Sequence, residues 1–377
     1  MNKKKILYFI SEDSFFCSHR LPLAVAAVKK GYNVSLVTKV STYGEYIKKQ
    51  GINLIHFDIN RSSINLFRCL KSIKKLVKIY KQEKPDLVHH VAIKNIIIGS
   101  ISAYLSGVKH VVNAITGMGY IYISKKKKVR ILRFIINICF KILLNKKNTK
   151  VIMQNKDDLC FLSNSGIVKN DQMVLIRGAG VDTNEFLYQE DIHNEYPIII
   201  FPSRLLLDKG INEFIAAANI LKKEGIKARF VLVGYIDHYN HSSISEDILK
   251  EYIESGDIEW WGNTLDMANV FTYANIVCLP SYREGLPKVL LEAASCGLPI
   301  VTTDTVGCRE VVIDGKNGFL VPVYSKDALA HALKKLILDA DLRKKMGLNG
   351  RNLVIKEFTI EKVVSETLLL YRECLQI

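Results

Sequence analysis

A chain of 377 residues is too long for one comfortable hydrophobic core, and it fits two domains of ordinary size. Hydrophobic residues make up 49% of the sequence, which excludes an intrinsically disordered protein. The eight cysteines show no C-x-x-C pairing, so we expect reduced core residues and no zinc site. No apolar run reaches the length of a membrane span, and residues 6–10 are too short for a signal-peptide core.

The charge is uneven along the chain. Residues 1–190 hold 32 Lys and Arg against 12 Asp and Glu, a net charge of +20. The remainder, with 21 basic and 25 acidic residues, has a net charge of −4. A basic first half suits a nucleic acid, an anionic membrane surface or an acidic substrate, and an ordinary solvated basic face would explain it equally.

Apolar runs alternate with helical patterns through the first half, which predicts a parallel sheet with helices on both faces. The expected strands are residues 5–10, 33–38, 53–57, 87–91, 110–114, 151–153 and 175–176. The expected helices are residues 21–31, 66–82 and 96–105, with a loop at 11–20 and a turn at 155–156.

Polar residues gather where two of these strands end. His89 and His90 leave the strand at 87–91, and Asn113, Thr116 and Gly117 close the next one. Open parallel sheets bind ligands at this edge. A lone histidine there is more often a satisfied core residue than a ligand-binding one.

Residues 125–147 have an apolar interior flanked by clustered lysines. Because Arg130, Arg133 and Lys141 interrupt the apolar residues, this segment cannot span a bilayer but could lie on one as an amphipathic helix. A domain helix with a basic outer face is the alternative.

In the second half, a buried strand ends at Pro202 and Ser203, and Arg204 and Lys209 come before a helix capped near Asn212. Two cations five residues apart at a helix start suit a diphosphate, although either alone would be ordinary surface charge. A further strand ends at Gly234, which allows close backbone approach, and the turn at 261–263 follows.

Residues 275–304 predict a strand at 276–279, a glycine turn, and a helix at 288–296. The first turn of such a helix has free N–H groups that bind phosphate oxygens. Glu284 lies in the turn and Glu292 in the helix. A carboxylate there suits a neutral sugar next to a phosphate, so a sugar nucleotide would satisfy both features. Alternatively, Glu284 complements the helix dipole and Glu292 pairs with Lys288.

The E-x7-E spacing of SYREGLPKVLLEAASCGLPIV resembles the signature of retaining glycosyltransferases of family 4, which have the GT-B fold. The resemblance implies that Glu284 contacts donor-sugar hydroxyls, that amides after it meet the sugar and diphosphate, and that Glu292 binds the ribose. It places Arg204 and Lys209 on the diphosphate. The other implied donor-binding residues are Gly234, Trp261, Gly262, Asn263, Ser281, Gly285, Leu286, Pro287 and Val289.

The segments SHRLPLA, VHHVAIKNIIIGS and VVNAITGMGY resemble a branch of this family that acts in surface-polysaccharide assembly. The resemblance implies that His90, with His89 as the alternative, lies beside the donor sugar. His19 and Arg20 would meet a diphosphate-bearing acceptor, unless His19 caps a helix and Arg20 is solvated. Asn113, Thr116 and Gly117 would line the acceptor side. The usual glycine-rich turn after the first strand is absent, and the usual second histidine position is Val91.

The resemblance implies two Rossmann-like α/β domains facing across a cleft. We expect an acceptor-binding domain at residues 1–185, a donor-binding domain at 186–358, and a last helix at 359–377 that returns to the first domain. The expected activity is metal-independent, retaining transfer of a hexose or N-acetylhexosamine from a UDP-sugar to a polyprenyl-diphosphate-linked saccharide, without a cofactor. The expected location is the cytoplasm, at the inner face of the membrane.

Two other function classes remain open. A GT-B sugar-nucleotide epimerase would share the nucleotide site but need acid/base carboxylates, and a nonenzymatic basic binder would need only the charged half. No nucleic-acid readout element is recognisable, so no nucleic-acid partner is expected. A metal-dependent GT-A enzyme would need a D-x-D at a strand end, and the candidate at residues 339–341 lies in a helical tract.

Overall fold

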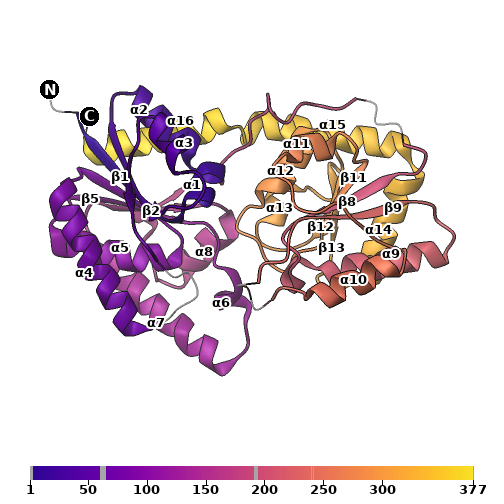
Figure 1. Cartoon of the computed structure of the whole chain (residues 1–377), viewed down its shortest axis with the longest axis horizontal. Coiled ribbons are helices and arrows are strands. Elements are labelled where there is room, and N and C mark those ends of the chain that lie inside the picture. The colour runs from indigo at the N-terminus through magenta and orange to yellow at the C-terminus, as the bar shows by residue number, and fades with distance from the viewer. Residues whose placement is uncertain (1–2, 60–64, 191–193, 239, 241, 377) are drawn as a thin grey trace. The chain divides into compact units, whose positions relative to one another are not determined.

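The computed structural model describes residues 3–59, 65–190, 194–238, 240 and 242–376, and it consists of two compact units. The first unit comprises Met1–Ala179 and Ile360–Ile377, and the second comprises Gly180–Thr359 (Figure 1). The limits expected from the sequence were residues 185 and 358. The chain thus leaves the first unit once and returns to it with its last helix, α16 (Ile360–Leu375).

Seven parallel strands form the sheet of the first unit, in the order β3-β2-β1-β4-β5-β6-β7. The strands are β1 (Lys5–Glu12), β2 (Asn33–Lys39), β3 (Asn53–His56), β4 (Leu87–Val91), β5 (His110–Ile115), β6 (Thr149–Met153) and β7 (Met173–Leu175). The helices are α1 (Asp13–His19), α2 (Leu21–Lys29), α3 (Gly44–Lys49), α4 (Leu66–Glu83), α5 (Ile93–Ser106), α6 (Gly119–Ile123), α7 (Lys127–Leu143) and α8 (Lys156–Asn164).

Both faces of this sheet are buried. Along β1, Ile6 and Tyr8 enter a core that includes residues of α2 and α16, whereas Leu7 and Phe9 enter a second core with residues of α4 and α5. Successive side chains of a strand point to opposite faces. The near-continuous apolar run of β1 is therefore explained by helices on both sides, as expected for an all-parallel sheet.

Two predictions about local structure in the first unit are wrong. The expected loop at 11–20 contains α1, which begins at Asp13; that carboxylate accepts hydrogen bonds from the backbone N–H groups of Ser41 (2.6 Å) and Tyr43 (3.0 Å). The expected turn at 155–156 is the start of α8, where Asn155 Oδ1 accepts a hydrogen bond from Asp158 N at 2.7 Å. Asn155 therefore caps α8, whereas the first residue of α1 binds the segment at 41–43 and no described side chain caps that helix.

Six parallel strands form the sheet of the second unit, in the order β10-β9-β8-β11-β12-β13. The strands are β8 (Ile198–Pro202), β9 (Arg229–Val233), β10 (Glu259–Trp260), β11 (Ile276–Leu279), β12 (Ile300–Thr303) and β13 (Gly318–Val321). The helices are α9 (Ile211–Lys223), α10 (Glu246–Glu254), α11 (Met267–Phe271), α12 (Lys288–Ser295), α13 (Cys308–Val311), α14 (Lys326–Leu338) and α15 (Ala340–Glu357).

The helix expected to be capped near Asn212 begins at Ile211, with Gly210 at the cap position. Gly210 has φ +80°, and a Cβ there would lie 2.2 Å from the carbonyl oxygen of Pro280. Only glycine permits both this conformation and this close approach between the segments after β8 and β11. The backbone therefore fixes where α9 starts.

Strand β4 carries two consecutive histidines that are fully buried. His89 Nδ1 hydrogen-bonds to the Tyr371 hydroxyl of α16 at 2.5 Å. His90 lies on the opposite face, where its Nε2 is 3.0 Å from the Tyr80 hydroxyl and its Nδ1 2.8 Å from Asn113 Oδ1. Burial lowers the pKa of His89 well below its usual range and lowers the pKa of His90 to about 4.

We expect the first unit to lose stability as the pH falls from 7 towards 4. In the unfolded chain both histidines titrate near pH ~6.5, so below that pH the unfolded state binds more protons. Each histidine should then lower the free energy of unfolding by up to about 1.4 kcal/mol per pH unit. For His90 this loss ends near its folded pKa of about 4.

Amide hydrogen exchange in β4 and β5, corrected for the intrinsic pH dependence, would measure this loss. Tryptophan fluorescence would not, because Trp260 and Trp261 both lie in the second unit. His90→Gln should reduce the slope of the unfolding free energy against pH, because the variant lacks one of the two titrating histidines. An identical slope in the native protein and the variant would contradict this account.

Candidate active site

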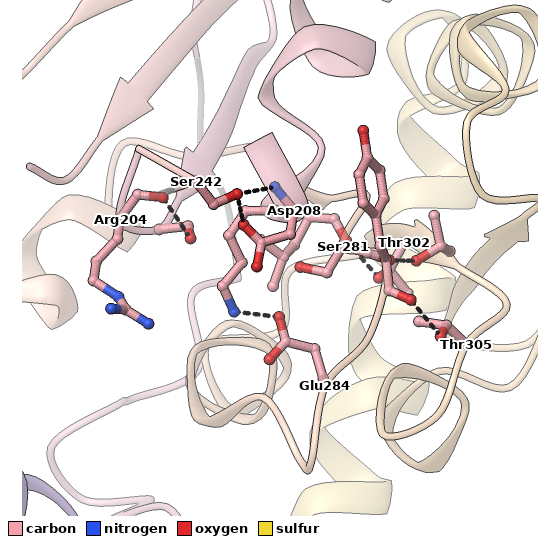
Figure 2. A network of polar contacts seen from close by, with 12 residues as sticks. Arg204, Asp208, Ser242, Ser281, Glu284, Thr302 and Thr305 are labelled. Atoms are coloured by element: carbon pink, nitrogen blue, oxygen red, sulfur yellow. Dashed lines mark hydrogen bonds and ion pairs between the residues drawn. The ribbon is translucent and has the colours of Figure 1, made fainter. Parts of the chain in front are cut away.

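The predicted donor-binding residues lie at one edge of the second sheet. Arg204 and Lys209 follow β8, Gly234 follows β9 and Glu284 follows β11. Because the strands are parallel, their carboxyl ends meet at this edge, where open α/β sheets bind ligands. Figure 2 shows Arg204 and Glu284 in the same close-up, on either side of the segment that carries Asp208.

Lys209 and Glu284 form an ion pair with an Nζ–Oε1 distance of 2.5 Å. Both side chains are largely buried, with 21% and 12% of their surfaces exposed. The lysine offsets the negative charge of the carboxylate. A carboxylate can therefore lie in a phosphate-binding turn without carrying a net repulsive charge, which was the difficulty that the sequence raised.

A set of hydroxyl groups holds the loop that carries Glu284. The Oγ1 atoms of Thr302, Thr303 and Thr305 donate to the carbonyl oxygens of Leu279, Ser281 and Tyr282 (Figure 2). Tyr282 N also donates to the carbonyl oxygen of Asp208 at 2.9 Å, which links this loop to the segment before Lys209. The hydroxyl of Ser281, a predicted donor-binding residue, is buried and has no partner within the described chain.

Helix α12 begins directly after this loop, with Pro287 at its cap position. Glu292 is 7% exposed and pairs with Lys288 at 2.7 Å, so the alternative role that the sequence left open for it is present. This ion pair does not exclude a ribose contact, because a carboxylate has lone pairs for more than one donor. The predicted residues Gly285, Leu286 and Val289 are half-buried around the helix start.

Arg204 forms an ion pair that the sequence did not predict. Its Nη1 lies 2.8 Å from Oδ2 of Asp237, which follows β9. The two side chains are 37% and 20% exposed, so the pair is accessible to solvent on one side. Arg204, Lys209 and Lys288 are thus each paired with a carboxylate.

Gly234 has φ +148°, and a Cβ there would lie 1.9 Å from the carbonyl oxygen of Ser203. Its N–H donates to the carbonyl oxygen of Gly262 at 2.8 Å. Any other residue at this position would force apart the ends of β8 and β9. The close backbone approach that the sequence predicted is present, and it holds the turn at 261–263 against β9.

The two tryptophans differ in position. Trp261, one of the donor-binding residues that the resemblance implies, packs against the core, and its Nε1 donates to Glu259 Oε2 at 3.1 Å. Trp260 is 41% exposed, donates to the carbonyl oxygen of Gly234 at 2.9 Å, and lines an open groove of about 750 Å³ with Tyr235 and Leu249. No role was predicted for Trp260. Because successive side chains of a strand point to opposite faces, the sequence could have indicated that only one of the two tryptophans is exposed. Asn263 is exposed.

In the first unit, the structure places His89 and His90 away from open surface. Each has no more than 1% of its surface exposed, and His90 lies against α5, where a Cβ on Gly99 would be 2.5 Å from its ring. Both rings are thus enclosed within the first unit, and the contact of a β4 histidine with the donor sugar stays a prediction. Asn113, predicted to line the acceptor side, is buried and accepts hydrogen bonds from Ser100 and His90 instead.

Arg20, predicted as a solvated or acceptor-binding cation, is 4% exposed. Its Nη1 donates to the carbonyl oxygens of His19 (3.1 Å) and Gly178 (3.3 Å), and burial lowers its pKa. His19 is half-buried, stacks on Phe15 and does not cap a helix. Of the two, only His19 has appreciable exposure.

Thr116 and Gly117 are half-buried directly after β5, at the ligand-binding edge of the first sheet. Ala92, directly after β4, has φ +77° and ψ 151°, a conformation that costs a residue with a Cβ on the order of 1–3 kcal/mol. No sequence signal marked Ala92, because alanine does not favour this region. Backbone strain at this edge is characteristic of functional sites.

Two further observations concern the cysteine near Glu284 and the possible metal ligands of the chain. Burial, together with the nearby Glu284 carboxylate, raises the pKa of the Cys308 thiol to about 12, so it is not a thiolate nucleophile. Within residues 3–59, 65–190, 194–238, 240 and 242–376, no group of three or more His, Cys, Asp or Glu side chains could hold a metal ion.

Comparison with known families matches both halves of the chain. Residues 5–155 match the glycosyl transferase 4-like family, and residues 182–353 match glycosyl transferases group 1. Together these matches span most of both units.

Individual proteins are similar over most of their length. The chain is 28% identical over 343 residues to N,N'-diacetylbacillosaminyl-diphospho-undecaprenol alpha-1,3-N-acetylgalactosaminyltransferase of Campylobacter jejuni, covering 88% of this chain and 89% of that protein. It is 27% identical over 329 residues to UDP-Gal:alpha-D-GlcNAc-diphosphoundecaprenol alpha-1,3-galactosyltransferase of Escherichia coli, covering 82% and 81%.

Among solved structures, a glycosyltransferase from Rickettsia africae superposes with a TM-score of 0.78 at 22% identity, covering 100% of this chain and 99% of that one. Its likeness concerns the fold, which is two α/β units with parallel sheets, as the resemblance to GT-B enzymes implied. The chain belongs to the family 4 glycosyltransferases of GT-B fold, with a glycosyl transferase 4-like half followed by a glycosyl transferases group 1 half.

Proposed function

We propose that this glycosyltransferase moves a hexose or N-acetylhexosamine from a UDP-sugar to a polyprenyl-diphosphate-linked saccharide during synthesis of a capsule, O-antigen or exopolysaccharide. The observation that carries the proposal is that Arg204, Lys209 and Glu284 follow neighbouring strands at one edge of the sheet, with the start of α12 directly after the Glu284 loop. The similar proteins of C. jejuni and E. coli, whose names specify undecaprenyl-diphosphate acceptors, support the acceptor class.

The chemical step would be driven by stabilisation of the leaving diphosphate. As the bond between the sugar C1 and the diphosphate oxygen breaks, the electron pair goes to the diphosphate and the sugar gains positive charge. Arg204, Lys209 and the N–H groups at the start of α12 would stabilise the growing negative charge. The Glu284 carboxylate, held by Lys209, would accept hydrogen bonds from sugar hydroxyls.

Retention would follow if the acceptor hydroxyl attacks the face that the diphosphate leaves. The departing phosphate oxygen then takes the acceptor proton, so no separate protein base is needed. His90 does not serve as one, because its ring is buried and engaged by Tyr80 and Asn113. Two cations and a helix terminus at the diphosphate would also make a divalent ion dispensable.

Incubation with UDP-sugars tests this function. We expect transfer to a polyprenyl-diphosphate-linked saccharide in the presence of EDTA, with the anomeric configuration of the donor retained in the product, as NMR would show. Activity that disappears in EDTA and returns with manganese or magnesium would refute metal independence. Epimerisation of the sugar nucleotide without transfer would favour the epimerase class instead.

Arg204→Ala should lower turnover about 10²- to 10³-fold at saturating donor, because it removes charge stabilisation that grows in the transition state. A matched control is Lys334→Ala, which removes a cation of similar exposure that is held by Glu224 and lies on α14; it should leave turnover unchanged. Circular dichroism should show both variants folded. Unchanged turnover of Arg204→Ala would reject the diphosphate assignment.

The acceptor class implies a membrane surface, and α7 has the features of a docking helix. Ile136, Phe140 and Leu143 face the core, while a second apolar stripe faces solvent. The stripe consists of Ile131, Phe134, Ile135, Ile138 and Ile142, each between 44% and 66% exposed. Lys127, Lys128, Arg130 and Lys141 lie on the same helix.

An apolar stripe with basic neighbours suits an anionic lipid surface. Each lysine close to such a surface contributes about 1 kcal/mol, and each large apolar side chain that leaves water contributes about 1.5–3 kcal/mol. No helix in the described part of the chain is long and apolar enough to cross a bilayer. The proposal is therefore that α7 lies on the inner leaflet, with its apolar stripe among the lipid headgroups.

Sedimentation with vesicles would test this docking. We expect binding to anionic vesicles, weaker binding at high salt, and loss of binding when Lys125, Lys126, Lys127 and Lys128 are changed to Gln. Phe134→Ser with Ile138→Ser should also weaken binding. Leu338→Ser, at an exposed leucine of the second unit, should not. Equal binding to anionic and neutral vesicles, or none to either, would reject electrostatic docking.

A further inference from the structure

Each of the three cations named in the donor site is paired with a carboxylate. Arg204 pairs with Asp237, Lys209 with Glu284 and Lys288 with Glu292. A diphosphate that binds Arg204 must therefore compete with a carboxylate already in place. Glu284 and Glu292 have proposed roles with the donor, whereas Asp237 has none.

Several bonds hold Asp237 in front of Arg204. Its backbone N–H donates to Ser243 Oγ at 3.0 Å, and Ser243 forms an isolated β-bridge with Leu206. Leu205 N donates to the carbonyl oxygen of Tyr235 at 3.0 Å, on the other side of Asp237 in the chain. The segments that carry the two charges are thus attached to each other on both sides of the ion pair.

Ser242, next to Ser243, forms a second connection between the same two segments. The Ser242 hydroxyl donates to Asp208 Oδ1, and Leu207 N donates to the carbonyl oxygen of Ser242 at 2.7 Å (Figure 2). The loop that carries Asp237 is therefore attached to the segment between Arg204 and Lys209. The ion pair between Arg204 and Asp237 is therefore held in place by backbone hydrogen bonds, unlike an exposed pair between two mobile side chains.

We propose that Asp237 is an internal counter-ion that occupies Arg204 when no donor is bound and competes with the donor diphosphate for it. The inference rests on the proposed function, in which Arg204 binds that diphosphate. Asp237 acts through Arg204, so it is a positioning residue and not a catalytic one. It holds the guanidinium at the edge where the carboxyl ends of the strands meet. Because it competes with the diphosphate, it also lowers the affinity for the donor.

The competition has a defined direction. A diphosphate carries more negative charge than one carboxylate and accepts two parallel hydrogen bonds from a guanidinium, so it displaces Asp237. When the nucleoside diphosphate dissociates, Asp237 pairs with Arg204 again. This new ion pair offsets part of the free energy lost when the diphosphate leaves the guanidinium. The carboxylate therefore weakens ground-state binding and favours release of the product.

Calorimetric titration of the full chain with UDP tests this inference. We expect Asp237→Asn to bind UDP about two- to tenfold more tightly than the native protein, because a partly exposed ion pair and one nearby like charge are removed. The KM for the donor should fall by a similar factor while kcat does not rise. In the Arg204→Ala background, Asp237→Asn should have a much smaller effect.

Asp257→Asn is the matched control. Asp257 is 16% exposed and pairs with Lys222, so this variant also removes a carboxylate that is held by a cation. It should leave the Kd for UDP unchanged. This comparison separates the effect at Arg204 from a general change in charge.

The outcomes distinguish the inference from the function on which it rests. Equal or weaker UDP binding by a folded Asp237→Asn variant would overturn the inference and leave the diphosphate site in place. Undiminished tightening in the Arg204→Ala background would overturn it too, because Asp237 would not act through Arg204. If the native protein binds no UDP, the proposed donor and the inference both fail.

Discussion

The ion pair between Lys209 and Glu284 connects the two segments on which the donor site depends. One segment follows β8 and the other follows β11, and these strands are neighbours in the second sheet. Their backbones approach closely at Gly210, where a Cβ would overlap the carbonyl group of Pro280. The pair is thus held by the fold, so the rotamer entropy of both side chains is lost on folding and not again when a ligand binds. It allows a carboxylate for sugar hydroxyls and a cation for phosphate to lie within hydrogen-bonding distance of each other.

The sequence predicted the buried strands and the starts of α2, α4 and α12, but it missed the short helix α1. Strands β4 and β11 have the predicted limits, because each is a fully buried apolar or mixed run that ends at a sharp change of composition. Helix α1 was missed because Asp13 is satisfied by Ser41 and Tyr43, far along the chain. Asp237 was missed for the same reason, since its partner Arg204 lies 33 residues away. Local patterns carry no information about such partners.

The two histidines of β4 show the limit of assigning a role to a residue from a family resemblance. In a strand that is buried on both faces, consecutive side chains enter two different cores, so His89 and His90 could not share one site. The structure gives each ring a tyrosine partner, Tyr371 on one face and Tyr80 on the other. The alternation was visible in the sequence, but the residues that cover each face were not. Burial on both faces accordingly favours the core role that the sequence analysis weighed against the functional one.

The charges of the chain act over two different ranges. The net +20 of residues 1–190 is a long-range feature, yet at physiological ionic strength the field of exposed charges decays within about 8 Å. It can therefore act only on a surface that is already close, such as the lipid surface on which we propose that α7 lies. The remaining residues are slightly acidic overall, so their attraction for a diphosphate cannot come from net charge. In the proposed donor site it would come from Arg204, Lys209 and the start of α12, at the partly buried edge of a sheet where screening is weaker. In that setting the partner of each cation, and not the charge of the domain, determines how tightly a phosphate is held.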